Sequence, residues 1–398
     1  MKIPRLLQIA TIVFFSIIIY SCAVKISPYN PTPTPKPVFP APNIYIAGYT
    51  VEESWSYKPS YWINSQKFNC HIADLEPDYD PWYDPYSMHL AVDKSNDVFM
   101  TLGYSYSMLT DYNGINGTTY GVCTNGEFSA LTGLSGEEIY ILNDISELNG
   151  DVYISGVSTR TNMDCSANAD PGHTNYCAVL WKNDTPAFLN ISGLNNLYDT
   201  SAQSIFLSGT NVYVLANIVK SDNTYKIGYW LNGSYNDQTY IFQSIPNISS
   251  FKGYQIELSD GILYESVTYY VSPSTLYFGY IKDGQLFVLK SIQNASNESI
   301  AGMKIAEGIV HMAFNYTVAG VQHSSIMTSN STELALKPDD TSYSGIYTYG
   351  MGIDGNAVSY TAGYIQDPSD YTMKGALWDS SGKSRYYDSA IFSDIFLK

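Results

Sequence analysis

The feature that most limits how this chain can fold is an internal repeat of roughly 50 residues. Each unit has a segment written apolar-Tyr-apolar-small-Gly, then one that ends in Tyr-Trp or a substitute, then an Asn-Gly-type pair and a short apolar segment. The clearest copies lie at 150–189 and 211–233. Apolar alternation between Asn-Gly or Asp-Gly pairs predicts antiparallel strands joined by tight turns.

The number of copies of the repeat can be counted from two of its positions. The Trp-type position falls at Trp62, Cys123, Trp181, Trp230, Tyr280, Met327 and Trp378. The Tyr-type position of the preceding strand falls at Tyr45, Phe99, Tyr153, Tyr213, Leu263, Val310 and Val358. Both counts give seven units, and a leading strand before a turn such as Asp260-Gly261 brings each unit to four strands. The pattern predicts an all-β fold, a seven-bladed β-propeller of four-stranded antiparallel blades.

The two ends of the repeat region predict how the ring closes. The first unit begins at Ile44 with its second strand, and the C-terminal segment 389–397 resembles the leading strand at 202–207. We therefore expect a propeller domain over 44–398 in which the C-terminal strand completes blade one. Ring closure of this kind removes the unpaired edges that an open sheet would expose.

The N-terminus has the pattern of an export signal and a tether. Residues 1–22 carry Lys2 and Arg5, then an apolar run that is too short to span a bilayer comfortably and ends at Cys22. The segment 19–22 resembles a bacterial lipobox, whose cysteine is acylated, although Tyr20 is larger than the usual residue. The proline-rich segment 23–43 favours an extended spacer. We expect a lipoprotein signal peptide over 1–22 and a tether over 23–43; ordinary secretion is the alternative.

The repeats and the lipobox together resemble a known group of proteins. Blades of the form VYVxGY and YWxNG behind a lipobox are similar to those of bacterial surface or periplasmic β-propeller lipoproteins. The resemblance covers about 43–398 and the leader, and its motif is structural. It implies the fold and a lipid-anchored location at the bacterial outer membrane or cell surface, and it assigns no catalytic residue.

Charge excludes one class of partner. The chain has 20 Lys and Arg against 37 Asp and Glu, a net charge of −17, so phosphate backbones and anionic lipid surfaces repel it. We expect no nucleic-acid partner, contact with the membrane through the lipid anchor, and a monomer.

Four cysteines remain besides Cys22. Cys165 and Cys177 flank an insertion, and a bond between them closes a loop of about a dozen residues, which stabilises the fold by about 3 kcal/mol in the chain-entropy model. By elimination, Cys70 pairs with Cys123. A metal site that uses His71, His89 and His173 is the alternative, but the chain lacks CxxC and HxxxH spacing, which favours two disulfides.

Long insertions point to one face of the predicted ring. Loops between second and third strands and connections between blades open on the same face, and insertions at 71–88, 104–120 and 156–177 fall there. Acidic and aromatic residues gather in the first two, where they could hold a sugar by ring stacking and carboxylate hydrogen bonds. The candidate ligand-binding residues are Asp74, Asp78, Asp80, Trp82, Tyr83, Asp84, Tyr86, Tyr104, Tyr106 and Tyr112. A solvated, proline-stiffened loop is the alternative, as is Ca²⁺ binding without EF-hand spacing; we expect no cofactor.

The sequence therefore favours a non-catalytic binding lipoprotein whose ligand is a glycan or a protein. The alternative is a carbohydrate-active enzyme, a glycosidase or lyase that uses carboxylates such as Asp78, Asp80 or Asp84 on the same face. The sialidase Asp box is absent, and no Gly-x-Ser-x-Gly elbow follows a strand. His311 lies within a predicted strand, where we expect it to be packed.

Overall fold

The computed structural model describes the compact unit that extends from Pro40 to Lys398. Within it the described residues are 43–51, 57–72, 82–84, 88–107, 116–134, 137–163, 165, 169–191, 197–220, 224–272, 274–337, 345–367, 369 and 372–398. The predicted signal peptide, its Cys22 and the tether up to residue 42 lie outside these ranges. No helix among the described residues is long and apolar enough to cross a bilayer.

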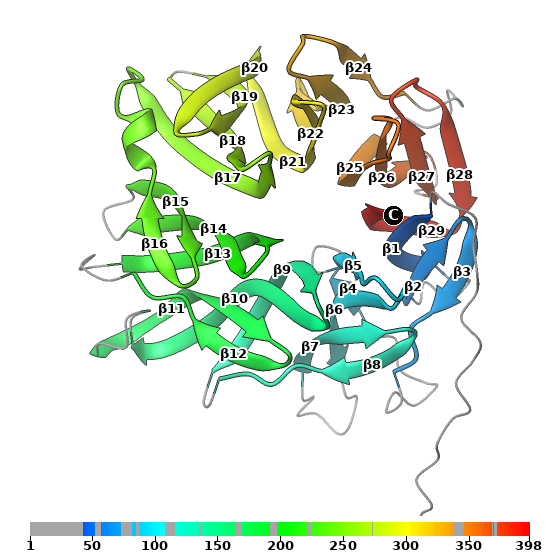
Figure 1. The fold of residues 1–398 in the computed structure, drawn as a ribbon, viewed down its shortest axis with the longest axis horizontal. Coiled ribbons are helices and arrows are strands. Elements are labelled where there is room, and N and C mark those ends of the chain that lie inside the picture. The colour runs from blue at the N-terminus through cyan, green and yellow to red at the C-terminus, as the bar shows by residue number, and fades with distance from the viewer. Residues whose placement is uncertain are drawn as a thin grey trace, which may run out of the picture. The chain divides into compact units, whose positions relative to one another are not determined.

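The described residues form seven antiparallel sheets, the seven predicted blades (Figure 1). Inner strands of neighbouring blades contact one another in the ring order β5, β9, β13, β17, β21, β25, β29 and back to β5. Hydrophobic clusters fill the spaces between blades; one joins Leu189 of blade three to Val214 and Trp230 of blade four. The prediction of a seven-bladed propeller is confirmed.

The strands of each blade follow from the inner edge outward. Blade one has β29 (Ala390–Leu397), β1 (Ile44–Val51), β2 (Tyr57–Ile63) and β3 (Gln66–Asn69); blade two has β4 (Trp82–Asp84) and β5 (Leu90–Val92), then β6 (Val98–Ser107), β7 (Asn116–Thr124) and β8 (Glu127–Ala130). Blade three has β9 (Glu138–Leu148), β10 (Asp151–Met163), β11 (Ala169–Lys182) and β12 (Thr185–Phe188); blade four has β13 (Leu197–Ser208), β14 (Asn211–Lys220), β15 (Tyr225–Leu231) and β16 (Ser234–Asp237). Blade five has β17 (Ile248–Ser259), β18 (Ile262–Val271), β19 (Thr275–Lys282) and β20 (Gln285–Gln293), preceded by the 3₁₀ turn η2 (Thr239–Phe242). Blade six has β21 (Ala295–Ala306), β22 (Ile309–Val318), β23 (Val321–Thr328) and β24 (Glu333–Ala335); blade seven has β25 (Gly345–Ile353), β26 (Ser359–Gln366), β27 (Met373–Asp379) and β28 (Ser384–Asp388).

In blades one to four, an asparagine in the turn after the third strand ties that strand to the start of the second. In blade four the Asn232 N–H donates to Val212 O, and the Val212 N–H donates to Asn232 Oδ1, both at 2.9 Å. Asn232 has a φ of 50°, a left-handed conformation that asparagine tolerates better than most residues. The same side-chain bond recurs at the equivalent turn residues Asn64, Asn125 and Asn183.

The buried tryptophans join neighbouring blades. Trp181 and Trp230 are fully buried, and each donates its Nε1–H at 3.1 Å to a carbonyl oxygen of the preceding blade, that of Thr132 and that of Asn190. In blade two, Cys123 stands in the position of this tryptophan, and it forms a disulfide with Cys70 at the end of blade one. Both predicted disulfides are present, the second between Cys165 and Cys177. The metal-site alternative for these cysteines is therefore wrong.

The predicted register was wrong in the last three blades. Trp230 is paired with Val214 in blade four, and the equivalent pair in blade five is Ile281 with Glu265, so the Trp-type position is Ile281 and not Tyr280. The Tyr-type positions are Tyr264, His311 and Tyr360 instead of Leu263, Val310 and Val358. In these blades neighbouring apolar residues match the pattern equally well, and blades five and six also lack the tryptophan. The count of seven is unaffected, and His311 is buried as predicted.

The C-terminal strand closes the ring as predicted. β29 pairs with β1 from Ile44 opposite Leu397 to Thr50 opposite Ala390, and Asn43 and Lys398 exchange two further main-chain hydrogen bonds. Phe392 at the centre of β29 is fully buried, with its ring 4.9 Å from the ring of Trp62.

We predict that Phe392→Ala lowers the free energy of unfolding by about 3–5 kcal/mol, because it leaves a cavity at the closing strand. Urea unfolding followed by tryptophan fluorescence measures the change. Phe392→Leu is the matched control and should cost much less, because leucine keeps most of the buried surface. Equal stability of the alanine variant and the wild type would show that closure does not depend on this packing.

Candidate functional site

The insertions predicted in blades one to three are present, but parts of them form strands or lengthen strands, where the sequence predicts loops. Trp82–Asp84, expected in a loop, form β4 and pair with the upper part of β6, with Tyr83 opposite Tyr104. Tyr104 and Tyr106 lie within β6. The loop expectation is wrong for these residues, because the end of the insertion supplies the inner partner of β6. Of the other candidates, Asp74, Asp78, Asp80, Tyr86 and Tyr112 lie outside the described residues.

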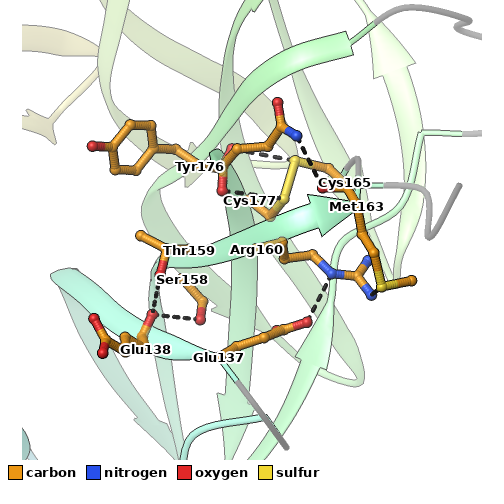
Figure 2. Close-up of polar contacts among 10 residues, drawn as sticks. Glu137, Glu138, Ser158, Thr159, Arg160, Met163, Cys165, Tyr176 and Cys177 are labelled. Atoms are coloured by element: carbon orange, nitrogen blue, oxygen red, sulfur yellow. Dashed lines mark hydrogen bonds and ion pairs between the residues drawn. A yellow bond between two sulfur atoms is a disulfide. The ribbon is translucent and has the colours of Figure 1, made fainter. Parts of the chain in front are cut away.

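The longest extension belongs to blade three. Strands β10 and β11 have 13 and 14 residues, whereas the second and third strands of blades four to seven have 7 to 10. The Cys165–Cys177 disulfide links the tip of this hairpin back to β11, with 5.2 Å between the two Cα atoms (Figure 2). We call this end of the blades, which carries second-to-third-strand loops and blade connections, the insertion face.

An ion pair anchors the same hairpin to the strand that precedes it. Arg160 Nε donates to Glu137 Oε1 at 2.7 Å, and the guanidinium carbon lies 4.4 Å from the centre of the Phe188 ring (Figure 2). Burial raises the pKa of Glu137, and the charge and hydrogen bond of Arg160 offset part of that rise. Both side chains are largely buried, so the pair braces the hairpin and does not offer a free acid to a ligand.

Two tyrosines on the insertion face were missed by the sequence analysis. Tyr140 is the extra residue of a bulge in β9 and is 51% exposed, and its ring centre lies 4.5 Å from that of half-buried Tyr176. A bulge changes the direction in which a side chain points, and the sequence pattern alone does not predict where a bulge lies. Tyr176 did leave a signal, because it stands five residues before Trp181, as Tyr57 stands before Trp62 and Tyr225 before Trp230.

The centre of the ring is a second candidate site. A cavity of about 420 Å³ is lined by the inner strands of all seven blades. Its polar lining includes Asn143, Asp144, Gln203, Lys304 and Asp394. Its volume would suit a small polar ligand.

Two aspartates that line this cavity, Asp144 and Asp394, hold neighbouring blades together. Asp394 Oδ2 accepts from the Leu90 N–H of blade two at 2.8 Å, and its Oδ1 accepts from the Ile395 N–H. Asp144 Oδ2 accepts from the Ile205 N–H of blade four at 3.0 Å, and its Oδ1 accepts from the Ile145 N–H. At the equivalent positions Ser204 and Gln255 accept from the next blade's main chain. All four oxygens of the two carboxylates are thus engaged by main-chain donors.

Electrostatics around Asp394 agree with a structural role. Burial raises the pKa of Asp394 to about 6; nearby His89 lowers it, and Asp144 raises it further. Lys304 Nζ, in the lining of the cavity, lies 3.3 Å from Glu257 Oε2 of blade five, so its charge is balanced by that carboxylate. The described residues contain no group of three or more His, Cys, Asp or Glu side chains that could hold a metal ion.

A buried glutamate lies between blades four and five. Glu265 is 1% exposed, and neither of its carboxylate oxygens accepts a hydrogen bond from the described residues. Burial raises the pKa of Glu265 to about 8, and the nearby Gln238 side chain offsets part of the rise. Glu265 is paired with Ile281, whereas the equivalent pair in blade four is Val214 with Trp230, so a polar group occupies a position that is apolar in the neighbouring blade.

We predict that Glu265→Gln makes the protein more stable than the wild type at pH 8.5, and by a smaller margin at pH 5. An unfolded glutamate loses its proton near pH 4.5, whereas the native state keeps it to about pH 8. The native state therefore binds more protons in this window, and the free energy of unfolding of the wild type falls as pH rises through it. Urea titrations at both values test this, with exposed Glu307→Gln as the control. A pH-independent difference would contradict a buried neutral acid.

Comparison with known proteins does not assign this chain to a family. No protein-family model matches the chain, and no curated protein matches it. Among solved structures, a family-25 polysaccharide lyase, an ulvan lyase, is 8% identical with a TM-score of 0.45 and covers 92% of this chain and 93% of its own. The Aleuria aurantia lectin is 9% identical, with a TM-score of 0.39 and coverage of 78% and 96%. AofleA from Arthrobotrys oligospora is 8% identical, with a TM-score of 0.37 and coverage of 82% and 94%. At these values the likeness does not extend to a ligand or a reaction.

Proposed function

We propose that this protein is a lipid-anchored, extracytoplasmic binding protein whose propeller takes a glycan or a protein on the insertion face. The observation that carries the proposal is the asymmetry of the ring. Blade three alone extends its second and third strands to 13 and 14 residues, and a disulfide braces the extension. Because such an extension adds little core, its size is best explained by what it presents to a partner.

The proposal includes no catalytic step. Asp144 and Asp394 line the cavity at the centre of the ring, and main-chain donors engage both oxygens of each. A general acid or base needs a lone pair or a proton free for the substrate. These two acids are better suited to holding blades together than to transferring protons. The enzyme alternative, a glycosidase or lyase that uses Asp78 or Asp80, is tested below.

The location is proposed from the N-terminal sequence. The lipobox-like segment that ends at Cys22, the proline-rich tether and the resemblance to propeller lipoproteins support anchoring at the bacterial outer membrane or cell surface. Two disulfides add support, because disulfides persist in oxidising compartments. The net charge of −17 supports attachment by the lipid alone and a partner other than nucleic acid.

We predict that Cys22→Ser moves the protein from the membrane pellet to the soluble extracytoplasmic fraction, because the variant has no thiol to acylate. Metabolic labelling with a palmitate analogue and fractionation measure the change in a bacterial host. The control replaces Cys165 and Cys177 together by serine: it removes two cysteines without touching the lipobox and without leaving a free thiol, and it should remain in the pellet. A labelled, membrane-bound Cys22→Ser protein would contradict the anchor.

We predict that replacing residues 74–80 by a Gly-Ser segment of equal length lowers ligand binding while leaving β4 intact. Binding is measured on a glycan array and on immobilised cell-surface proteins. The control replaces Ser380 and Ser381, in a turn at the opposite end of blade seven, and should bind as the wild type does. Unchanged binding by the 74–80 variant would remove that segment from the site. Release of products from a polysaccharide, lost in Asp78→Asn or Asp80→Asn, would overturn the non-catalytic assignment.

A further inference from the structure

The exposed tyrosine pair of blade three is flanked by a polar row. Thr159 of β10 lies directly opposite both Glu138 of β9 and Tyr176 of β11, so these three side chains share one face of the blade. Glu138 is exposed, and Thr159 and Tyr176 are half-buried. Arg160, the next residue along β10, lies on the opposite face with its ion pair, so it does not neutralise this row (Figure 2).

The pair is held rigidly. The Tyr120 hydroxyl donates to the Tyr140 carbonyl oxygen, which fixes the main chain of the bulge. The Tyr176 N–H donates to Asp199 Oδ1 of blade four at 3.0 Å, and the Cys165–Cys177 disulfide is formed one residue further along β11. Aromatic groups that are fixed before binding lose little conformational entropy when a ligand arrives.

These features match the chemistry of a sugar ring. A pyranose presents an apolar C–H face, which packs on an aromatic ring, and hydroxyl groups at its edge, which donate to a carboxylate or accept from a hydroxyl. Tyr140 supplies the exposed ring; Tyr176, Thr159 and Glu138 supply the polar edge. A carboxylate beside the ring in a protein of net charge −17 disfavours uronic acids and sulfated sugars.

We propose that Tyr140 and Tyr176, with Glu138 and Thr159, form a subsite for a pyranose unit of a neutral polysaccharide. The subsite rests on the proposed function and specifies its ligand class. A second exposed aromatic lies at the same end of the next blade: Tyr225, in the register position of Tyr176, is 37% exposed, and its ring centre is 6.3 Å from that of Phe251. The recurrence around the ring suits a polymer that contacts successive blades.

The test measures the affinity of the full chain for soluble neutral polysaccharides, a β-glucan, a galactomannan and an α-mannan, by affinity electrophoresis and calorimetry. We expect Tyr140→Ala to weaken binding by about tenfold or more, as loss of an aromatic anchor does. Tyr140→Phe keeps the ring and should bind within about threefold of the wild type. The control is Phe287→Ala, because Phe287 is 39% exposed and lies in β20 just after the turn between β19 and β20, at the opposite end of blade five. Thermal unfolding verifies that each variant is folded.

The outcomes separate this subsite from the proposed function. If Tyr140→Ala binds as the wild type does while the 74–80 replacement abolishes binding, the subsite is wrong and the proposed function stands. Preference for an anionic polymer such as alginate, or binding of protein alone, overturns the neutral-sugar subsite in the same way. If the wild type binds neither glycans nor proteins, both proposals fail.

Discussion

The pairing of β29 with β1 is the interaction on which the rest of the structure depends. The main contacts of each blade, over the residues that the structure describes, are with its two neighbours, so an open row of seven would leave two apolar blade faces exposed to water. The C-terminal strand prevents this by supplying the inner strand of the first blade. Asp394 of the same strand also accepts a hydrogen bond from Leu90 of blade two, so one segment joins the two ends of the chain to the next blade.

The inner strands meet in two different ways around the ring. Strand β9 has a second bulge, at Asn143, and β13, β17, β21, β25 and β29 have one at the equivalent position. Where a polar residue follows this bulge, as Asp144 does, its side chain bridges to the main chain of the next blade. Where glycine follows it, the blades approach more closely: a Cβ at Gly302 would lie 2.5 Å from Met351 Cβ, and one at Gly350 would lie 2.7 Å from Asp394 Cα. In both arrangements, the residues at the centre of the ring are needed for the contacts between blades. Variation that serves a ligand is therefore easier to accommodate at the loops.

The sequence was sufficient for the fold because tight turns and tryptophans mark most blades. In blades five to seven, neighbouring apolar residues match the pattern equally well, so the predicted register differs from the observed one by one or two positions. The site was less predictable. Composition cannot separate a loop from an elongated strand, which is why Trp82 was placed in a loop, and Tyr140 depends on a bulge whose position only pairing defines. Tyr176 could have been found from its spacing to Trp181.

The two disulfides lie in the blades that carry insertions, and this location has a physical reason. In blade two, Cys123 occupies the position where blades one, three, four and seven have a tryptophan, and a covalent bond to Cys70 replaces the ring and the hydrogen bond that Trp181 and Trp230 make to the preceding blade. In blade three, Cys165 and Cys177 restrain a hairpin that extends beyond the interblade core. Cross-links restrict the unfolded chain and need little buried surface. They allow the insertion face to project polar and aromatic groups that the hydrophobic core does not hold in place.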